Sequence, residues 1–448
     1  MRRPSSSCSA LLVRWLDELG RISEERDQLT RTFLSPAMRR ANDRVAGWMR
    51  EAGLTVREDR FGNIAGRIES SRPGAPVLFL GSHLDTVRDA GKFDGALGVL
   101  LPIAALIELC RRGVSLPYAV EVIGFSEEEG VRFPTAYLGS KAFTGQLRAA
   151  DLNLRNANGV SVREALQRWS GLTPSRRTGV AERVSVSREC FTASTTPRLG
   201  VKSLPRRENL IGYVEVHLEQ GPVLERENLP VGVVSAIAGQ TRGRWTFRGR
   251  AGHAGTTPMH LRRDALAGAA EFLTVAEGLA RASEPLVVTA GSLSVKPGAP
   301  NVIPGEVVFS LDVRHPRNAS RRAALRLLRL AAQKIAHNRK LTCAWEQTQD
   351  NGAVACSPKL MTLLEESVRK VHGRSLQLMS GAGHDAVIMS AKMPVGMLFV
   401  RCRDGLSHHP DEHASAADVD VALQVMVDFL ERLASPPRVA RTTTATRK

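Results

Sequence analysis

Short, almost uninterrupted apolar runs are the feature that most constrains the fold of this chain. Three of them have the length of a strand: PVLFLG, AVEVIGF and PVGMLFVRC. Strands of this kind are buried on both faces, and when they alternate with helices they form a parallel sheet that helices cover on both sides. The run GVLLPIAALIELC lies between the first two and supplies one covering helix. We therefore predict an α/β domain with a mixed, largely parallel sheet.

A different pattern interrupts this domain. RGRWTFRGR and EVVFSLDVR alternate apolar and polar residues, as half-exposed antiparallel strands do, and two amphipathic helices accompany them. This order fits a β-α-β-β-α-β, ferredoxin-like unit inserted into the larger domain. We assign residues 1–236 and 350–434 to the larger domain and residues 237–349 to the smaller α+β domain.

Three further segments are predicted from composition and periodicity. The first 50 residues are expected to be helical, with Gly53 as the stop signal. Residues 172–208 are rich in Ser, Thr and Arg with weak periodicity, which is typical of a surface insertion. Residues 435–448 are expected to be a disordered tail.

The composition excludes several classes of protein. The 448 residues carry a net charge of +17, and a charge of this sign makes polyanions such as nucleic acids candidate partners. There is no zinc-finger spacing, no RNP-type aromatic motif and no concentrated basic block outside the termini, so we expect no nucleic-acid binding. No apolar run reaches the roughly 18 residues of a membrane span, and the first apolar stretch is too short for a secretory signal. The six cysteines are widely spaced, as buried thiols in a reducing compartment would be. We expect a cytoplasmic protein that does not bind membranes.

The strongest chemical signal is GSHLDTVRDAGKFDG, which begins where a buried strand ends. Open α/β sheets place their sites at the carboxyl ends of strands. His83 can bind a metal through one ring nitrogen, and Asp85 is placed to accept a hydrogen bond from the other nitrogen or to orient the next ligand. Asp94 lies in a loop flanked by glycine and could bridge two cations. The segment therefore points to a metal site.

Three consecutive acids, Glu127, Glu128 and Glu129, end the next buried strand. An acidic triplet on its own usually lies in a solvated loop. Directly after a buried strand and before Gly130, it is better explained by a cation that offsets the repulsion between the carboxylates. One acid could then bind the metal while its neighbour works as a base.

Further histidines stand in ordered contexts. They are His217, His253, His384, His408 and His409. A single histidine is more often a surface or structural residue than a ligand. Two histidines, an aspartate and a glutamate at strand ends are different, because hydrolytic dinuclear zinc sites use this set of nitrogen and oxygen donors. Spacing alone leaves His408 and His409 as competitors.

Other catalytic motifs are absent or lack their context. The run Gly381 to Ala386 matches G-x-G-x-x-A, but without the strand–turn–helix setting of a dinucleotide site. Neither HExxH nor GxSxG occurs, which excludes thermolysin-like and serine-hydrolase sites.

Six segments carry a resemblance to a known family: GSHLDTVRDAGKFDGALGVL, FSEEEGVRF, HLEQGP, GHAGTTPM, NVIPGEVVFSLDVR and SGAGHDA. In combination they resemble the hydantoinase/carbamoylase family of amidases, part of the dinuclear-metal aminoacylase and carboxypeptidase superfamily. The resemblance extends from about Leu11 to Leu433. Within the family, DTVRDAGKFDG, EEGVRF and AYLGS look most like the allantoate amidohydrolases.

The resemblance implies a site for two divalent metal ions, with Zn²⁺ as the first choice and Mn²⁺ or Co²⁺ as alternatives. The implied ligands are His83, Asp94 as the bridge, Glu129, His217 and His408. The family pattern favours His408 over His409 because it places the ligand directly after Ser407. Glu128 would be the general base. The implied substrate contacts are Gln220, His253, Asn301, Arg314 and His384.

The implied reaction is hydrolysis of a ureido C–N bond in a small carboxylate, with release of ammonia and carbon dioxide. Glu128 would take a proton from water and return it to the leaving nitrogen. His253 would stabilise the developing oxyanion, and Arg314 would bind the substrate carboxylate with its planar fork.

Allantoate is the first choice of substrate, and N-carbamoyl-L-amino acids, ureidoglycolate and β-ureidopropionate are the alternatives. A metal-binding scaffold without catalysis is disfavoured because every expected ligand and Glu128 are present. In the family the inserted domain acts as lid and dimer interface, so we expect a homodimer in which some residues of this domain serve the partner's site. The chain departs from the family in the length of residues 172–208 and in having Ala90-Gly91 where two glycines are common.

Overall fold

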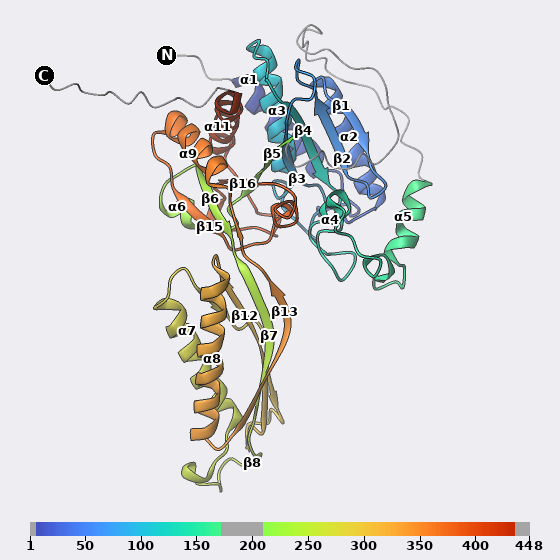
Figure 1. The fold of residues 1–448 in the computed structure, drawn as a ribbon. Helices are drawn as coiled ribbons and strands as arrows, with labels where there is room; N and C mark the ends of the chain where they lie inside the picture. The colour runs from blue at the N-terminus through green and yellow to red at the C-terminus, as the bar shows by residue number, and fades with distance from the viewer. Residues whose placement is uncertain (1–5, 172–208, 435–448) are drawn as a thin grey trace, which may run out of the picture. The chain divides into compact units, whose positions relative to one another are not determined.

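The computed structural model describes residues 6–171 and 209–434. The predicted insertion at 172–208 and the predicted tail at 435–448 lie outside these ranges. The chain divides into two compact units. Unit 1 comprises Met1–Ser235, Cys356–Leu378 and His384–Lys448, and unit 2 comprises Ala236–Ala355 and Met379–Gly383. Figure 1 shows the helices and strands of both.

The larger sheet has nine strands in the order β1-β2-β4-β3-β5-β16-β6-β14, with β15 beside β6. Its strands are β1 (Thr55–Glu58), β2 (Ile64–Ile68), β3 (Val77–His83), β4 (Ala119–Phe125), β5 (Leu210–Leu218), β6 (Val231–Ile237), β14 (Val354–Ala355), β15 (Gln377–Ser380) and β16 (Val395–Val400).

The centre of this sheet is parallel and its flanks are antiparallel. Strands β4, β3, β5 and β16 run parallel to one another, whereas β2 joins β4 and β6 joins β16 in antiparallel pairs. Every residue of β3, β4 and β16 is buried, as their continuous apolar sequences require. The predicted mixed, largely parallel sheet is confirmed.

The helices of unit 1 are α1 (Ser6–Gly20), α2 (Pro36–Glu51), α3 (Ala96–Arg111), α4 (Leu138–Thr144), α5 (Val162–Ser170), α6 (Val223–Arg226), α9 (Pro358–His372), α10 (Asp385–Met389) and α11 (Ala416–Ala434). Helix α3 is apolar almost all round, so it must be buried. It packs on β3 beneath α1 and α11, and the main core lies between these helices and the sheet.

The predicted N-terminal helix is wrong between residues 21 and 35, where the chain is irregular. The reason is tertiary. The buried Arg31 guanidinium donates to the carbonyls of Leu84 at 2.6 Å and of Leu19 and Ile22 at 3.0 Å. The segment therefore supports the chain just after β3. The predicted stop at Gly53 agrees with its φ of +82°, directly after α2.

Unit 2 holds an antiparallel sheet in the order β10-β12-β7-β13, with β9 beside β12. Its elements are β7 (Gly239–Arg248), β8 (Gly252–His253), α7 (Ala265–Arg281), β9 (Val287–Thr289), β10 (Leu293–Lys296), β11 (Val302–Ile303), β12 (Glu306–His315), α8 (Asn318–Asn338) and β13 (Thr342–Asn351). Burial alternates along β7 and β12, and a second core joins the sheet to α7 and α8. This is the α+β unit that the alternating sequences predict.

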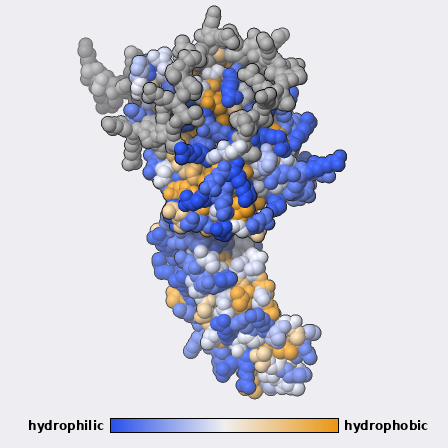
Figure 2. Space-filling model, turned by 90° about the vertical axis from the view of Figure 1, so that its right-hand side faces the viewer, coloured by the Kyte–Doolittle hydropathy of each residue, from blue (hydrophilic) through white to orange (hydrophobic). Residues whose placement is uncertain are grey.

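Unit 2 also carries most of the exposed apolar side chains. Eight large hydrophobic side chains stand out as exposed among the described residues, and seven of them belong to this unit. They are Met259, Leu261, Val275, Val287, Leu293, Leu327 and Leu330. Figure 2 shows apolar patches on the lower part of the molecule, among polar residues. None of the described helices is both long and apolar enough to cross a membrane.

Candidate metal centre

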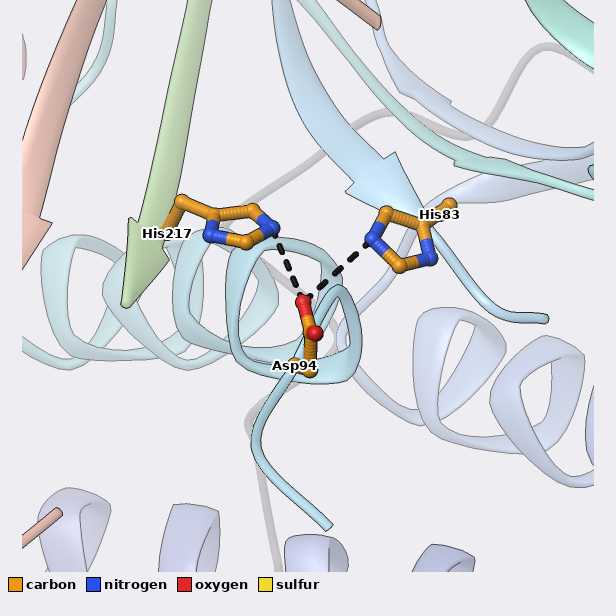
Figure 3. Close-up of side chains that lie close together, drawn as sticks. All are labelled: His83, Asp94 and His217. Carbon is orange, nitrogen blue, oxygen red and sulfur yellow. Dashed lines mark ion pairs between the residues drawn. The ribbon is translucent and has the colours of Figure 1, made fainter. Parts of the chain in front are cut away.

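Three potential ligands of unit 1 converge at the carboxyl ends of parallel strands. His83 is the last residue of β3, His217 lies near the end of β5, and Asp94 lies in the loop before α3. Oδ1 of Asp94 is 3.0 Å from Nε2 of His217 and 3.6 Å from Nε2 of His83 (Figure 3). All three side chains are buried. Gly95 allows this approach, because its φ is +64° and a Cβ there would lie 2.5 Å from the His83 ring.

The other face of Asp94 meets a second group of donors. Its Oδ2 lies 3.3 Å from Nε2 of His408, and the same nitrogen is 3.6 Å from Oε1 of Glu129. His409 points elsewhere, since its Nδ1 accepts the Asp411 backbone N–H at 3.2 Å. Of the two competing histidines, the structure brings His408 to Asp94. One carboxylate thus stands between two sets of donors, as a residue that bridges two cations would.

The tautomers of the two buried histidines indicate that these donors fit a cation. The Nδ1 atoms of His83 and His217 each lie 3.0 Å from a backbone carbonyl oxygen, of Asp85 and Leu218 respectively. A proton on Nδ1 leaves the Nε2 lone pair of a neutral ring facing Oδ1 of Asp94. That oxygen is buried and receives no hydrogen bond from the described residues. Two lone pairs aimed at a carboxylate oxygen are stable only with a positive charge between them.

The electrostatics of these side chains also favour a positive charge at this place. Burial is the largest single influence and opposes ionisation of Asp94, but His217, His408 and His83 together hold the pKa of Asp94 well below its ordinary value. Burial also opposes a charge on His83, yet its contacts with Asp85 and Asp94 raise the pKa of this ring well above the ordinary value. The three side chains thus form a place where positive charge is favoured.

The three consecutive acids have three different surroundings. Glu127 accepts the backbone N–H groups of Gly130 at 2.7 Å and Leu138 at 2.8 Å, so it shapes the loop. Glu128 and Glu129 instead lie with His83 in a group of potential ligand atoms. Spacing alone could not distinguish the acids, because their roles depend on where the loop directs each side chain; only the resemblance to a known family assigned Glu128 as the base and Glu129 as a ligand.

Asp85 holds this loop in place. Its carboxylate accepts the backbone N–H of Glu128 at 3.0 Å and of Glu129 at 3.2 Å. Its Oδ1 is 3.5 Å from Nδ1 of His83, farther than its own backbone oxygen is. Asp85 therefore orients the acids more directly than it orients the histidine.

Burial also sets the protonation of the acids. It raises the pKa of Glu128 well above its ordinary value, opposed by the charge on His83 and assisted by the charge on Glu129. Burial raises the pKa of Glu129 to about 7, and the charge on Asp94 adds to the effect. A carboxyl with a raised pKa is suited to exchange a proton near neutral pH.

Two of the expected substrate contacts also lie at this centre. Gln220 adopts a φ of +55°, and its amide donates to Oδ2 of Asp94 at 3.2 Å and to Oγ of Ser407 at 3.1 Å. His384 is buried at the start of α10, with its ring centroid 4.5 Å from that of His217. Burial and the charge on His217 lower the pKa of His384 well below its ordinary value, which favours the neutral form of this imidazole.

The other three expected contacts lie in unit 2, in two separate places. His253 in β8 pairs with Val302 in β11, and Asn301 accepts the N–H of Ala254 at 2.9 Å, so His253 and Asn301 are neighbours. Nδ1 of His253 accepts the N–H groups of Gly255 at 3.0 Å and Thr256 at 3.2 Å. The proton of the neutral ring is therefore on Nε2, where it is available as a donor.

Arg314 lies far from this pair. It is opposite Gln240 in the pairing of β12 with β7, whereas the His253 strand follows the other end of β7. The eight residue-to-residue steps from Glu306 to Arg314 alone span about 26 Å at the usual rise of a strand. Arg314 also has a partner already, since its Nε and Nη2 donate to Asp312 at 3.0 and 2.9 Å.

Two buried acids that support the centre, Glu215 and Glu412, are not among the residues predicted from the sequence. Glu215 lies two residues before His217 on the same face of β5, and it accepts the Ser82 hydroxyl at 2.7 Å and the Ala386 N–H at 3.0 Å. An acid inside a buried strand is the signal that could have revealed it. Glu412 follows His408 by four residues in a loop, and nothing in the spacing marked it.

The whole chain is similar to known proteins of one family. Residues 79–432 match the model of a protein family described as "Peptidase family M20/M25/M40". The chain is 40% identical to an allantoate deiminase of Arabidopsis thaliana, covering 93% of this chain and 81% of the relative. It is 38% identical to an N-carbamoyl-L-amino acid amidohydrolase of Geobacillus stearothermophilus, covering 94% and 97%. A crystal structure of a hydantoinase/carbamoylase family amidase from Burkholderia multivorans superposes with a TM-score of 0.83 at 30% identity, covering 96% and 98%.

Proposed function

Because this chain belongs to peptidase family M20/M25/M40, we propose that it is a metal-dependent amidohydrolase that cleaves the ureido C–N bond of a small carboxylate, with allantoate as its substrate. The products would be ammonia and carbon dioxide together with the remaining amine product. The same family membership makes the chain a hydrolase and accounts for the resemblance to hydantoinase/carbamoylase amidases.

The position of Asp94 between two groups of donors is the main support for this function. Its two oxygens face different donors, His83 and His217 on one side and His408 with Glu129 on the other. Such a set fits two divalent cations bridged by one carboxylate. Histidine and carboxylate donors suit Zn²⁺, which we propose as the resident ion, with Mn²⁺ and Co²⁺ as alternatives.

Glu128 would move the protons of the reaction. Two bound cations would make a water molecule more acidic and would polarise the ureido carbonyl. Glu128 is buried beside the ligands and has a raised pKa, so it can accept a proton from that water and pass it to the leaving nitrogen. Asp85 fixes the backbone on which Glu128 stands. His384 favours the neutral form, which suits hydrogen bonding to an uncharged part of the substrate.

Unit 2 would supply the groups that bind the substrate. Nε2–H of His253 can donate to the developing oxyanion, with Asn301 beside it. Nη1 and Nη2 of Arg314 can each still offer one N–H to the substrate carboxylate, while Asp312 holds the guanidinium from the other side and the Gly381 carbonyl accepts from Nη1. These assignments follow the matching motifs, and the tautomer of His253 and the pairing of Arg314 support them.

A homodimer accounts for the separation of these residues. A small ureido acid is far shorter than the distance that divides His253 from Arg314, so one substrate molecule cannot contact both in the same chain. We propose that the partner subunit supplies His253 and Asn301. The apolar side chains exposed on unit 2 support an interface on this unit.

A cytoplasmic location completes the proposal. The five cysteines that the structure describes form no disulfide bond, which suits a reducing compartment. A small carboxylate is the expected ligand, and neither a nucleic acid nor a membrane is needed by the site.

The substrate is tested by ammonia release from the metal-loaded protein. Allantoate should be turned over faster than N-carbamoyl amino acids, ureidoglycolate or β-ureidopropionate. A clear preference for N-carbamoyl-L-amino acids would replace allantoate with the second candidate, which the relative from Geobacillus stearothermophilus favours. Absence of ammonia from all four classes would refute the ureido assignment.

A further inference from the structure

Glu412 is buried behind the metal centre and is not among the proposed ligands. It reaches two loops with one carboxylate. Oε1 accepts the backbone N–H groups of Phe93 at 3.1 Å and Asp94 at 3.0 Å. Oε2 accepts the hydroxyl of Ser407 at 2.8 Å. Glu412 therefore connects the loop that carries Asp94 with the loop that carries His408.

Ser407 extends this connection to the side chain of the bridging residue. Its Oγ is 3.2 Å from Oδ2 of Asp94, the oxygen that faces His408. The Gln220 amide donates to the same Oδ2 and to Oγ of Ser407. The rotation of the Asp94 carboxylate, and so the direction of Oδ2, depends on these contacts.

The backbone is shaped to admit Glu412. A Cβ on Gly91 would lie 2.4 Å from Cβ of Glu412 and 2.5 Å from its Oε1. Because Cβ cannot move without the backbone, a larger residue at position 91 would displace Glu412. A side chain is accommodated at the neighbouring Ala90, because the φ of this residue is not positive.

We propose that Glu412 is a positioning residue for the cation site formed by Asp94, Glu129 and His408, acting on Asp94 through the backbone and through Ser407. The other site, formed by His83, Asp94 and His217, depends on it less, because β3 and β5 fix its histidines. The inference rests on the two-cation site of the proposed function. It predicts that the two sites respond unequally to loss of Glu412.

The test measures Co²⁺ binding to the full-length protein by metal analysis and by the visible absorption of the bound ion, with no substrate present. Wild type should bind two ions. Glu412→Ala should bind one ion as tightly as before and the second about 10- to 100-fold more weakly, the usual effect of losing a group that orients a ligand. Gly91→Ala keeps the carboxylate but displaces it, so it should weaken the same ion to a smaller extent.

Two variants separate positioning from a general loss of stability. Glu412→Gln should keep both ions, because its amide oxygen can accept the two backbone N–H groups while its amide N–H donates to Ser407. Asp264→Ala removes a carboxylate that accepts the N–H groups of Leu266 and Ala267 in unit 2, at 3.0 and 3.1 Å. It should lower the melting temperature yet leave both ions bound.

The inference is overturned if Glu412→Ala and Gly91→Ala both bind two ions with wild-type affinity, or if Glu412→Gln weakens binding as much as Glu412→Ala. A wild-type protein that binds no second ion would overturn both this inference and the two-ion proposal. If Glu412→Ala does not fold, Gly91→Ala and Ser407→Ala decide the question by the same measurement.

Discussion

The proposed active-site residues of the two units are held in different ways. In unit 1 the donors around Asp94 are mostly buried, and strand ends, backbone carbonyls and buried acids fix them. In unit 2, His253 and Asn301 are exposed in short local structure, and Arg314 is half-buried on one face of the sheet, where Asp312 holds it. A cation site needs fixed ligands in the unbound state, whereas groups that meet the substrate can be completed by the substrate or by a second subunit.

Removal of divalent ions should abolish turnover, because the buried histidines and carboxylates of unit 1 then hold only protons. Ammonia release after chelation and dialysis should fall to background and return on addition of Zn²⁺, Mn²⁺ or Co²⁺. The melting temperature should also rise when metal is restored, since an ion that binds only the folded state stabilises it. Full activity in the thoroughly chelated protein would contradict the metal centre.

Glu128→Gln should lower kcat by about 10²- to 10⁴-fold, the usual contribution of a general acid–base group. The amide keeps the shape of the side chain but cannot accept the proton of water. Metal content should stay at the wild-type level, because the proposed ligands are unchanged, and metal analysis provides that control. A variant that retained wild-type turnover on its best ureido substrate would show that another group is the base.

Arg314→Lys tests the substrate contact of unit 2. A lysine cannot bind Asp312 through two parallel N–H groups and still present a second pair to a carboxylate. We expect KM to rise about 10- to 100-fold, equivalent to about 1.5–3 kcal/mol for a hydrogen bond to a charged group, with a smaller change in kcat.

Arg244→Lys is the matched control for that variant. Arg244 lies on β7 in the same sheet, and its ion pair with Glu346 is exposed on both sides. An exposed pair of this kind contributes little, so KM should not change. Equal KM values for the wild type and both variants would remove Arg314 from the substrate site.

Mixed subunits test whether the residues of unit 2 act across a dimer. Glu128→Gln and His253→Ala should each be nearly inactive alone. If His253 serves the partner's site, one site of each mixed dimer is intact, and equal mixing after dissociation should restore roughly a quarter of wild-type activity. No recovery, although mixed dimers are shown to form, would place His253 in the site of its own chain.

Much of this architecture could be predicted from the order of the residues alone. Continuous apolar strands require burial on both faces, and alternating strands require burial on one. The sequence patterns therefore predict the two kinds of sheet. His83 and the three acids were conspicuous because polar groups directly after buried strands must meet at the same edge of the sheet. The resemblance to known amidases gave His217 and His408 their roles as ligands and added Arg314.

The tertiary structure decided what depends on direction in space. Spacing could not separate His408 from His409 or assign different surroundings to Glu127, Glu128 and Glu129, because neighbouring residues in a loop have no fixed period. Three features came from contacts between segments far apart in sequence: the irregular chain around Arg31, the bridge through Glu412, and the distance between His253 and Arg314. A sequence records which side chains are available and how the backbone prefers to run. Only the folded chain determines which of them share a few ångströms of space, because that follows from packing the whole core.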